Sequence, residues 1–90
     1  QDCVARWGGE EFLFILPQTT AHNAYVFAEK IKHQLQNHLF HSNDDEFTIT
    51  VSMGIAQLDK KKSIDEVIHN ADKYLYQAKN SGRNAIFPKY

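Results

Sequence analysis

The chain has 90 residues, a length that suits one small domain or part of a larger one. Its composition, 42% hydrophobic and 12% aromatic, is typical of a globular protein and excludes a disordered chain. With ten basic and eleven acidic residues, the net charge of −1 argues against a broad nucleic-acid-binding surface, so we expect no nucleic-acid partner.

The sequence also indicates the cellular compartment in which the protein is expected. No apolar run is long enough to cross a membrane, and no signal-peptide pattern opens the chain. The single cysteine, Cys3, can form neither an intramolecular disulfide nor a cysteine-based zinc cluster. We expect a buried, reduced thiol there, which is consistent with a cytoplasmic protein. Because the sequence opens at Gln1, already close to the first predicted strand, we expect a cut through a larger domain.

Two strands are predicted at the start of the chain. Cys3–Trp7 is strand-like, and Glu10–Leu16 is its hairpin partner, which Pro17 ends. Gly8 and Gly9 between them predict a tight turn. The second strand is almost continuously apolar, so we expect it in the centre of a sheet, covered on both faces.

A helix and a third strand follow. Thr19 or Thr20 can cap the helix, and apolar residues spaced by three and four continue to Leu39. This pattern predicts an amphipathic helix of about five turns. Residues 41–46 are polar and predict a loop. Residues 47–55 alternate apolar with small or polar side chains, which predicts a strand whose small face leaves room for a close neighbour.

The remaining elements complete a mixed fold. Residues 59–62 form a charged loop, and Ser63 with Glu66 predicts a capping box for a second helix. Gly82 suits the left-handed cap after that helix, and residues 85–87 predict a last short strand. The order ββαβαβ predicts an α+β domain with helices packed on a mainly antiparallel sheet.

Two pairs of charged residues are candidates for chemistry. Adjacent strand side chains point to opposite faces, but distortion at a turn can bring Glu10 and Glu11 to one Mg²⁺. Lys79 and Arg83, around the end of the second helix, can hold phosphates. Taken alone, each pair is better explained locally, as solvated glutamates and as cations favoured by the helix dipole.

Other polar and aromatic residues have simpler interpretations. His38 and His41 have the spacing of zinc ligands, but scattered surface histidines are the favoured interpretation. Residues 60–62, three lysines, are interpreted as a solvated loop. Tyr74 and Tyr76 flank the apolar stripe of the second helix, where core packing explains them better than base stacking.

Three segments together resemble the GGDEF family, the diguanylate cyclases. Residues 6–12, Arg-Trp-Gly-Gly-Glu-Glu-Phe, resemble its active-site loop in the GGEEF form. Residues 48–56 resemble its strand ending in Ser-x-Gly-Ile-Ala. Residues 71–84 match its stretch Ala-Asp-x-x-Leu-Tyr-x-Ala-Lys-x-x-Gly-Arg-Asn. The matches follow the family's order and spacing and cover essentially the whole chain.

The resemblance implies a palm-like nucleotidyl cyclase fold. On that basis residues 1–90 are a single partial GGDEF domain, its C-terminal half, without the first strand and first two helices. In the family that strand supplies a metal-binding Asp, and nearby residues bind guanine and phosphates. A sensor domain is expected upstream in the parent protein, where further segments can anchor an otherwise cytoplasmic enzyme to a membrane.

The resemblance also implies an activity and roles. The family condenses two GTP molecules into cyclic di-GMP and pyrophosphate at a dimer interface, with two Mg²⁺ ions per active site, or Mn²⁺. Glu10 would bind metal and act as, or position, the general base, and Glu11 would be a second metal ligand. The substrate-binding residues implied by the resemblance are Gly8, Gly9, Lys79 and Arg83.

The resemblance also implies a product-inhibition site, of which only part falls within this sequence. Asp2 has the spacing of the last residue of the family's Arg-x-x-Asp motif, and Lys30 falls near where such members often place another Arg. The structural alternative for Asp2 is a carboxylate at a strand edge.

Two expectations concern the fragment itself. Because half of the metal site is absent, we expect the isolated chain to be inactive, and to self-associate through an exposed sheet edge. The alternative function is a non-catalytic GGDEF-like module that senses GTP or cyclic di-GMP or docks a partner.

Overall fold

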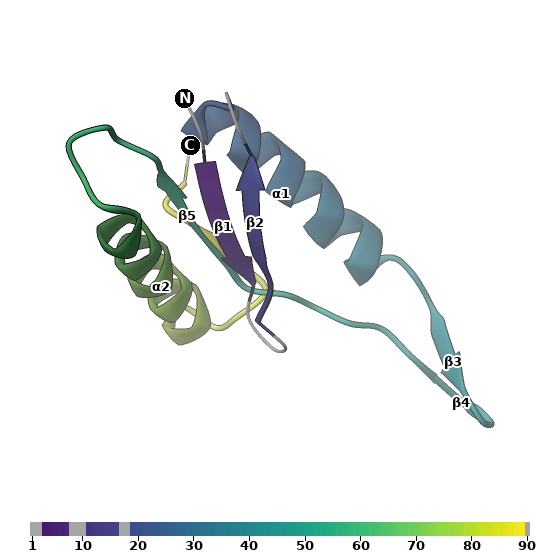
Figure 1. Cartoon of the computed structure of the whole chain (residues 1–90). Helices are drawn as coiled ribbons and strands as arrows, with labels where there is room; N and C mark the ends of the chain where they lie inside the picture. The colour runs from purple at the N-terminus through teal and green to yellow at the C-terminus, as the bar shows by residue number, and fades with distance from the viewer. Residues whose placement is uncertain (1–2, 8–10, 17–18, 90) are drawn as a thin grey trace.

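The computed structural model describes residues 3–7, 11–16 and 19–89 (Figure 1). No helix among these residues has the length and apolar character needed to span a membrane. The elements in chain order are β1 (Cys3–Trp7), β2 (Leu13–Leu16), α1 (Ala21–Gln36), β3 (Phe40–Ser42), β4 (Asp45–Phe47), β5 (Met53–Gln57), α2 (Ile64–Asn80) and β6 (Ile86–Phe87).

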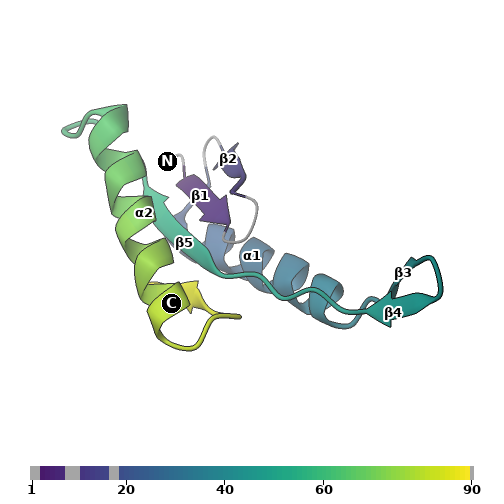
Figure 2. The ribbon, with the colours of Figure 1, turned by 90° about the horizontal axis from the view of Figure 1, so that it is seen from below.

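The main sheet has the strand order β2-β1-β5-β6. Strand β1 is antiparallel to both β2 and β5, and β5 is parallel to β6. Helices α1 and α2 lie on opposite faces of this sheet (Figure 2). This arrangement confirms the predicted α+β class with a mainly antiparallel sheet.

Alternate residues of β1 enter two separate cores. Cys3 and Ala5 are buried with Ala28 of α1 on one face, and Val4 is buried with Val67 of α2 on the other. This is the two-residue periodicity of a strand covered on both faces. The Cys3 thiol is buried and forms no disulfide, as predicted, and its Sγ donates to the backbone oxygen of Thr19 at 2.7 Å.

The ends of both helices follow local sequence signals. The Thr20 hydroxyl oxygen accepts from the backbone N–H of Asn23, and the Ser63 hydroxyl oxygen accepts from that of Glu66, each at 3.1 Å. These bonds satisfy N–H groups that a helix leaves unpaired at its start. Gly82 follows α2 with φ of 107°, the left-handed conformation predicted for it.

The segment between α1 and β5 differs from prediction. Helix α1 ends at Gln36, and the predicted loop after it contains a hairpin, β3–β4, with Asn43 at φ of 55° in its turn. Phe47 is paired with Phe40 across this hairpin, where the two rings stack with centroids 5.8 Å apart. The alternating run from Phe47 is therefore split, and β5 begins only at Met53. The hairpin extends away from the sheet in both views (Figures 1 and 2).

Two burial predictions were wrong. Strand β2 lies at an edge of the described sheet, with Leu13 45% and Ile15 50% exposed, rather than in its centre. A continuous apolar run does not by itself place a strand between two neighbours. Tyr76 is 67% exposed on α2, so core packing does not explain it, whereas Tyr74 is half-buried.

The small face of β5 is occupied by α2. A Cβ added at Gly54 would lie 2.1 Å from the backbone oxygen of Ala71 and 2.4 Å from the backbone nitrogen of Leu75. No side chain fits at those distances, so glycine lets the helix backbone rest on the strand. The close neighbour that the small residues predicted is therefore the second helix.

Candidate active site

A row of alternating charges joins β1, the connection to β2 and helix α2. Arg6 donates from Nη1 to Oδ1 of Asp72, and from Nη2 to Oε2 of Glu11 at 2.7 Å. The other oxygen of Glu11, Oε1, lies 3.9 Å from Nζ of Lys79. We call these four side chains, Asp72, Arg6, Glu11 and Lys79, the charge row.

The backbone explains why the row forms. Arg6 shares the α2 face of β1 with Val4, two residues earlier, because strand side chains alternate. Asp72 and Lys79 are seven residues apart on α2, about two helical turns, so both lie on the flank that faces β1. The backbone N–H of Trp7 donates to the oxygen of Phe12 at 3.0 Å, which closes the connection and places Glu11 beside Arg6.

Partial burial makes the row more than a set of surface charges. The side chains of Arg6 and Lys79 are 22% and 30% exposed, and that of Glu11 is 46% exposed. A carboxylate that accepts from a guanidinium in a fixed fork is held in one orientation. At 3.9 Å, Lys79 is too far from Glu11 for a hydrogen bond, so its ammonium can turn its donors to an incoming anion.

The structure places some of the predicted site residues and not others. Asp2, Gly8, Gly9 and Glu10 lie outside the described residues. Glu11 and Lys79, predicted from separate motifs, are close together. The fold therefore brings these two predicted site residues to one location.

Arg83 and Lys30 stand apart from the charge row. Arg83 is exposed with φ of 65°, and its backbone N–H donates to the oxygen of Ala78 at 3.2 Å, a bond typical of a Schellman motif. No hydrogen bond or ion pair joins its side chain to the row in the described part of the chain. Lys30 is exposed on α1, on the other face of the sheet.

Sequence reasoning gave no role to Arg6 or Asp72, although both fall within the segments that carry the family resemblance. They are 66 positions apart, and no local spacing connects a strand residue to a helix residue at that distance. Their opposite charges were the one signal available, and it does not specify a partner.

The zinc interpretation finds no support among the residues that the structure describes. There, no three His, Cys, Asp or Glu side chains are grouped as metal ligands. The His38 ring packs edge-on against Phe40, and Nδ1 of His41 lies 3.7 Å from the Glu46 carboxylate. These are the surface histidines that the favoured interpretation predicted.

A magnesium ion fits Glu11 as one oxygen ligand. Oε2 of Glu11 accepts a hydrogen bond from Arg6. Among the described ion pairs, the partner of Oε1 is Lys79, and its Nζ is 3.9 Å away. A carboxylate offers about four lone-pair positions, so Oε1 can still coordinate a hard cation. The remaining ligands would have to come from beyond the described residues.

Comparison with known proteins identifies what this chain resembles. The family model described as "Diguanylate cyclase, GGDEF domain" matches residues 1–85. Diguanylate cyclase DgcM of Escherichia coli K12 is 42% identical over 85 residues, which are 94% of this chain and 20% of that protein. Diguanylate cyclase A of Treponema denticola is 33% identical over 86 residues, 94% of this chain and 23% of that protein.

Solved structures agree with these relatives. The GGDEF domain of DgcB from Caulobacter crescentus, in complex with c-di-GMP, has a TM-score of 0.81 and 32% identity. The match covers 88% of this chain and 47% of that one. The active GGEEF domain of a diguanylate cyclase from Vibrio cholerae has a TM-score of 0.76 and 30% identity, covering 92% of this chain and 54% of that one. The chain thus spans about a fifth of the curated relatives and about half of these solved chains.

Proposed function

The chain belongs to the GGDEF family of diguanylate cyclases, and from that membership we propose that it forms the C-terminal part of a domain that condenses two GTP molecules into cyclic di-GMP and pyrophosphate. The observation that carries the proposal is the charge row. It brings Glu11, from the GGEEF loop, to within 3.9 Å of Lys79, from the helix segment that matches the family's phosphate-binding stretch.

The cations act on the phosphates of GTP. Lys79 supplies a point charge that can follow the terminal phosphates as they leave, and Arg83 supplies a planar fork. Charge builds on the pyrophosphate when the 3′-hydroxyl of one GTP attacks the α-phosphate of the other, so cations fixed nearby stabilise that state. Gly8 and Gly9 would let the nucleotide lie against the backbone, where a Cβ would intrude.

The two carboxylates would hold the metal and assist removal of the proton from the attacking hydroxyl. Glu10 would bind metal and accept, or orient the acceptor of, the proton of the attacking hydroxyl, and Glu11 would add a ligand through Oε1. Mg²⁺, or Mn²⁺ in its place, would when bound neutralise phosphate charge and make the hydroxyl easier to deprotonate. Arg6 is a positioning residue, because its bond to Asp72 anchors the guanidinium that orients Glu11.

The rest of the active site lies upstream in this proposal. A preceding strand and two helices would complete the domain and supply the metal-binding Asp, consistent with the chain's coverage of 47% of a solved GGDEF domain chain. The complete enzyme would act as a cytoplasmic homodimer, each domain bringing one GTP, under the control of an upstream sensor domain. Asp2 and the exposed Lys30 would contribute to a site where cyclic di-GMP inhibits its own synthesis.

A chimera tests the activity directly. Residues 1–85 would replace the matched segment of DgcM, and cyclic di-GMP would be measured by chromatography after incubation with GTP and Mg²⁺. We expect product, loss of activity with EDTA, and recovery with Mg²⁺ or Mn²⁺. Lys79→Ala should lower kcat/KM by about tenfold or more, as expected for a lost charged contact to phosphate. Lys73→Ala, an exposed lysine on the same helix, is the matched control and should have no effect.

Two results would contradict parts of the proposal. A folded chimera that binds GTP or cyclic di-GMP but makes no product would establish the non-catalytic module instead. Product from the isolated 90-residue chain would overturn the expectation that an upstream segment completes the site.

Sedimentation of the isolated chain adds a separate check, because the exposed β2 edge leads us to expect self-association rather than a clean monomer.

A further inference from the structure

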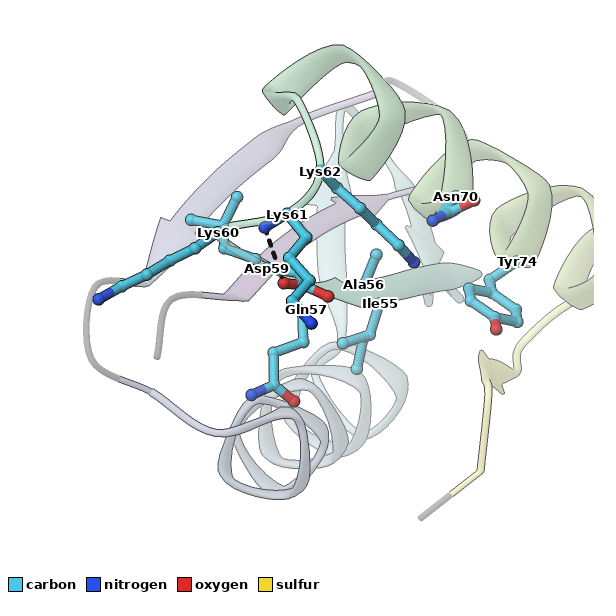
Figure 3. Close-up of a pocket in the computed structure, with 10 residues that line it drawn as sticks. Ile55, Ala56, Gln57, Asp59, Lys60, Lys61, Lys62, Asn70 and Tyr74 are labelled. Atoms are coloured by element: carbon cyan, nitrogen blue, oxygen red, sulfur yellow. Dashed lines mark hydrogen bonds between the residues drawn. The ribbon is translucent and has the colours of Figure 1, made fainter.

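A cavity lies apart from the charge row. It has a volume of about 970 Å³ and lies at the C-terminal end of β5, beside the middle of α2 (Figure 3). Its wall combines residues of β5, the β5–α2 loop and α2. The polar residues of its lining include Gln57, Lys60, Lys61, Lys62, Asn70 and Tyr74.

The cavity and the charge row occupy opposite flanks of α2. Asn70 and Tyr74 are one helical turn apart and line the cavity, while Asp72 turns to Arg6 on the other side. The buried stripe of the helix separates the two flanks, since successive helix residues are rotated by about 100°. No residue of the charge row lines the cavity, so it is a second location with chemistry of its own.

The loop gives the cavity an excess of positive charge. Three lysines and one aspartate line it, which leaves a net charge of about +2. Asp59 is turned inward on its own loop, where Oδ1 accepts from the backbone N–H of Lys61 at 2.9 Å. Its backbone oxygen accepts from the N–H of Lys62 at 3.0 Å, which closes the turn. In the part of the chain that the structure describes, no ion pair neutralises these lysines.

The lysine side chains are not equivalent. Lys62 extends from the loop toward Asn70 and Tyr74, whereas Lys60 extends away from them (Figure 3). An ammonium group, a side-chain amide and a phenol ring therefore border one hollow. The volume lies within the range of about 300–1,000 Å³ that is usual for small-molecule sites.

We propose that this cavity binds a nucleoside di- or triphosphate, with its phosphates on Lys61 and Lys62 and its base against Tyr74 and Asn70. Ammonium groups bind phosphate as mobile point charges, which suits a loop position. The Asn70 amide can both donate and accept, as a base edge requires, and a tyrosine ring offers a stacking surface. A bare phosphate would use the lysines alone, so the ring and the amide select for a nucleotide.

The test titrates the isotope-labelled chain with ATP, pyrophosphate and adenosine and follows the amide signals by NMR. The chain would carry Lys79→Ala and Arg83→Ala, so that binding at the proposed active site does not contribute. We expect ATP to move the signals of Lys62 and of the Asn70 side-chain amide, and to bind at least about tenfold more tightly than either pyrophosphate or adenosine.

Matched variants make the assignment specific. Lys62→Ala should raise the Kd for ATP by about tenfold, and Lys60→Ala, with the same loss of charge from the same loop, by less than about twofold. Tyr74→Leu should weaken binding, and Tyr74→Phe should preserve it, because the ring is what stacks. The amide spectrum of each variant shows whether it is folded, and equilibrium dialysis on the DgcM chimera repeats the lysine comparison in a complete domain.

Three outcomes would overturn the proposal. Pyrophosphate binding as tightly as ATP would show a simple anion site without a base subsite. Equal effects of Lys60→Ala and Lys62→Ala would show only general attraction by the loop charge. Signal changes confined to residues around Glu11, or no changes at all, would show that the cavity does not bind nucleotides.

Discussion

Arg6 on β1 and Asp72 on α2 are joined by a hydrogen-bonded ion pair across 66 positions of sequence. The same guanidinium also donates to Glu11 in the connection between β1 and β2. One side chain therefore fixes the hairpin to the helix, and it does so beside the residues to which we assign phosphate and metal binding.

Replacing Arg6 by lysine should lower the free energy of unfolding. Arg6→Lys keeps the charge but cannot donate from two separated nitrogens, so one of its two bonds should be lost. We expect the free energy of unfolding to fall by about 1–2 kcal/mol, measured by urea denaturation. Lys73→Ala on the exposed side of α2 should change it by less than about 0.5 kcal/mol. If Arg6→Lys and Asp72→Asn were additive in a double-mutant cycle, the two residues would not be coupled.

Glu11→Gln should weaken metal use in the DgcM chimera. An amide oxygen is a poorer ligand for Mg²⁺ than a carboxylate, so the Mg²⁺ concentration for half-maximal activity should rise, with kcat lower by about tenfold. Glu46→Gln in the projecting hairpin removes the same charge far from the row and serves as the control. An unchanged Mg²⁺ dependence would remove Glu11 from the set of metal ligands.

Gly54→Ala should be far more damaging than Gly82→Ala. At Gly54 the new methyl group would meet the backbone of Ala71 at 2.1 Å, so the helix would have to move away from the sheet. We expect a loss of about 3 kcal/mol or more for that change. At Gly82 nothing lies within 4 Å of the added carbon, and its positive φ alone should cost about 1 kcal/mol. Thermal unfolding of both variants gives the comparison, and equal losses would contradict the packing of α2 on β5.

Tyr25 should make stability depend on alkaline pH. Burial raises the pKa of its phenol above the ordinary value of 10.0, and a hydrogen bond to Glu29 and the charge of that carboxylate raise it further. The folded protein therefore holds this proton more tightly than the unfolded chain does. The resulting stabilisation is fully present below pH 10 and is lost as the pH rises through the folded pKa. Urea denaturation from pH 8 to 11 should show a smaller decline for Tyr25→Phe, and parallel curves would contradict the assignment.

Sequence signals predicted correctly those features of the fold that depend on neighbouring residues. Thr20 and Ser63 cap the helices that their positions predicted, and Gly82 takes the left-handed conformation predicted from its place after the helix. Each of these depends on hydrogen bonds or dihedral angles within a few residues. The resemblance to the GGDEF family likewise rested on contiguous motifs, and the family match over residues 1–85 confirms it.

Non-local pairing explains what the sequence did not reveal. Phe47 continues the alternating pattern of the strand after it, but its partner is Phe40, and a one-dimensional pattern does not identify a cross-strand neighbour. The ion pair between Arg6 and Asp72 is also a contact between residues distant in sequence, so no local pattern predicts it. Residues 60–62 are exposed, as predicted for a solvated loop, but the sequence did not reveal that Asn70 and Tyr74 line the same cavity.

The contact at Gly54 also determines where the chain tolerates changes of length. In the β1–β5 ladder Gly54 is paired with Arg6, and on its other side it holds the backbone of α2. A residue added or deleted within the helical residues 64–71 would rotate Asp72 away from Arg6, because successive helix residues are rotated by about 100°. The exposed residues 59–62 connect the two packed elements and can change in length without moving either of them. The β3–β4 hairpin projects beyond the sheet, so insertions at its turn leave the ion pair between Arg6 and Asp72 intact. Length variation in natural or engineered variants should accumulate at Asn43 and in residues 59–62, and be excluded from β5 and from the part of α2 before Asp72.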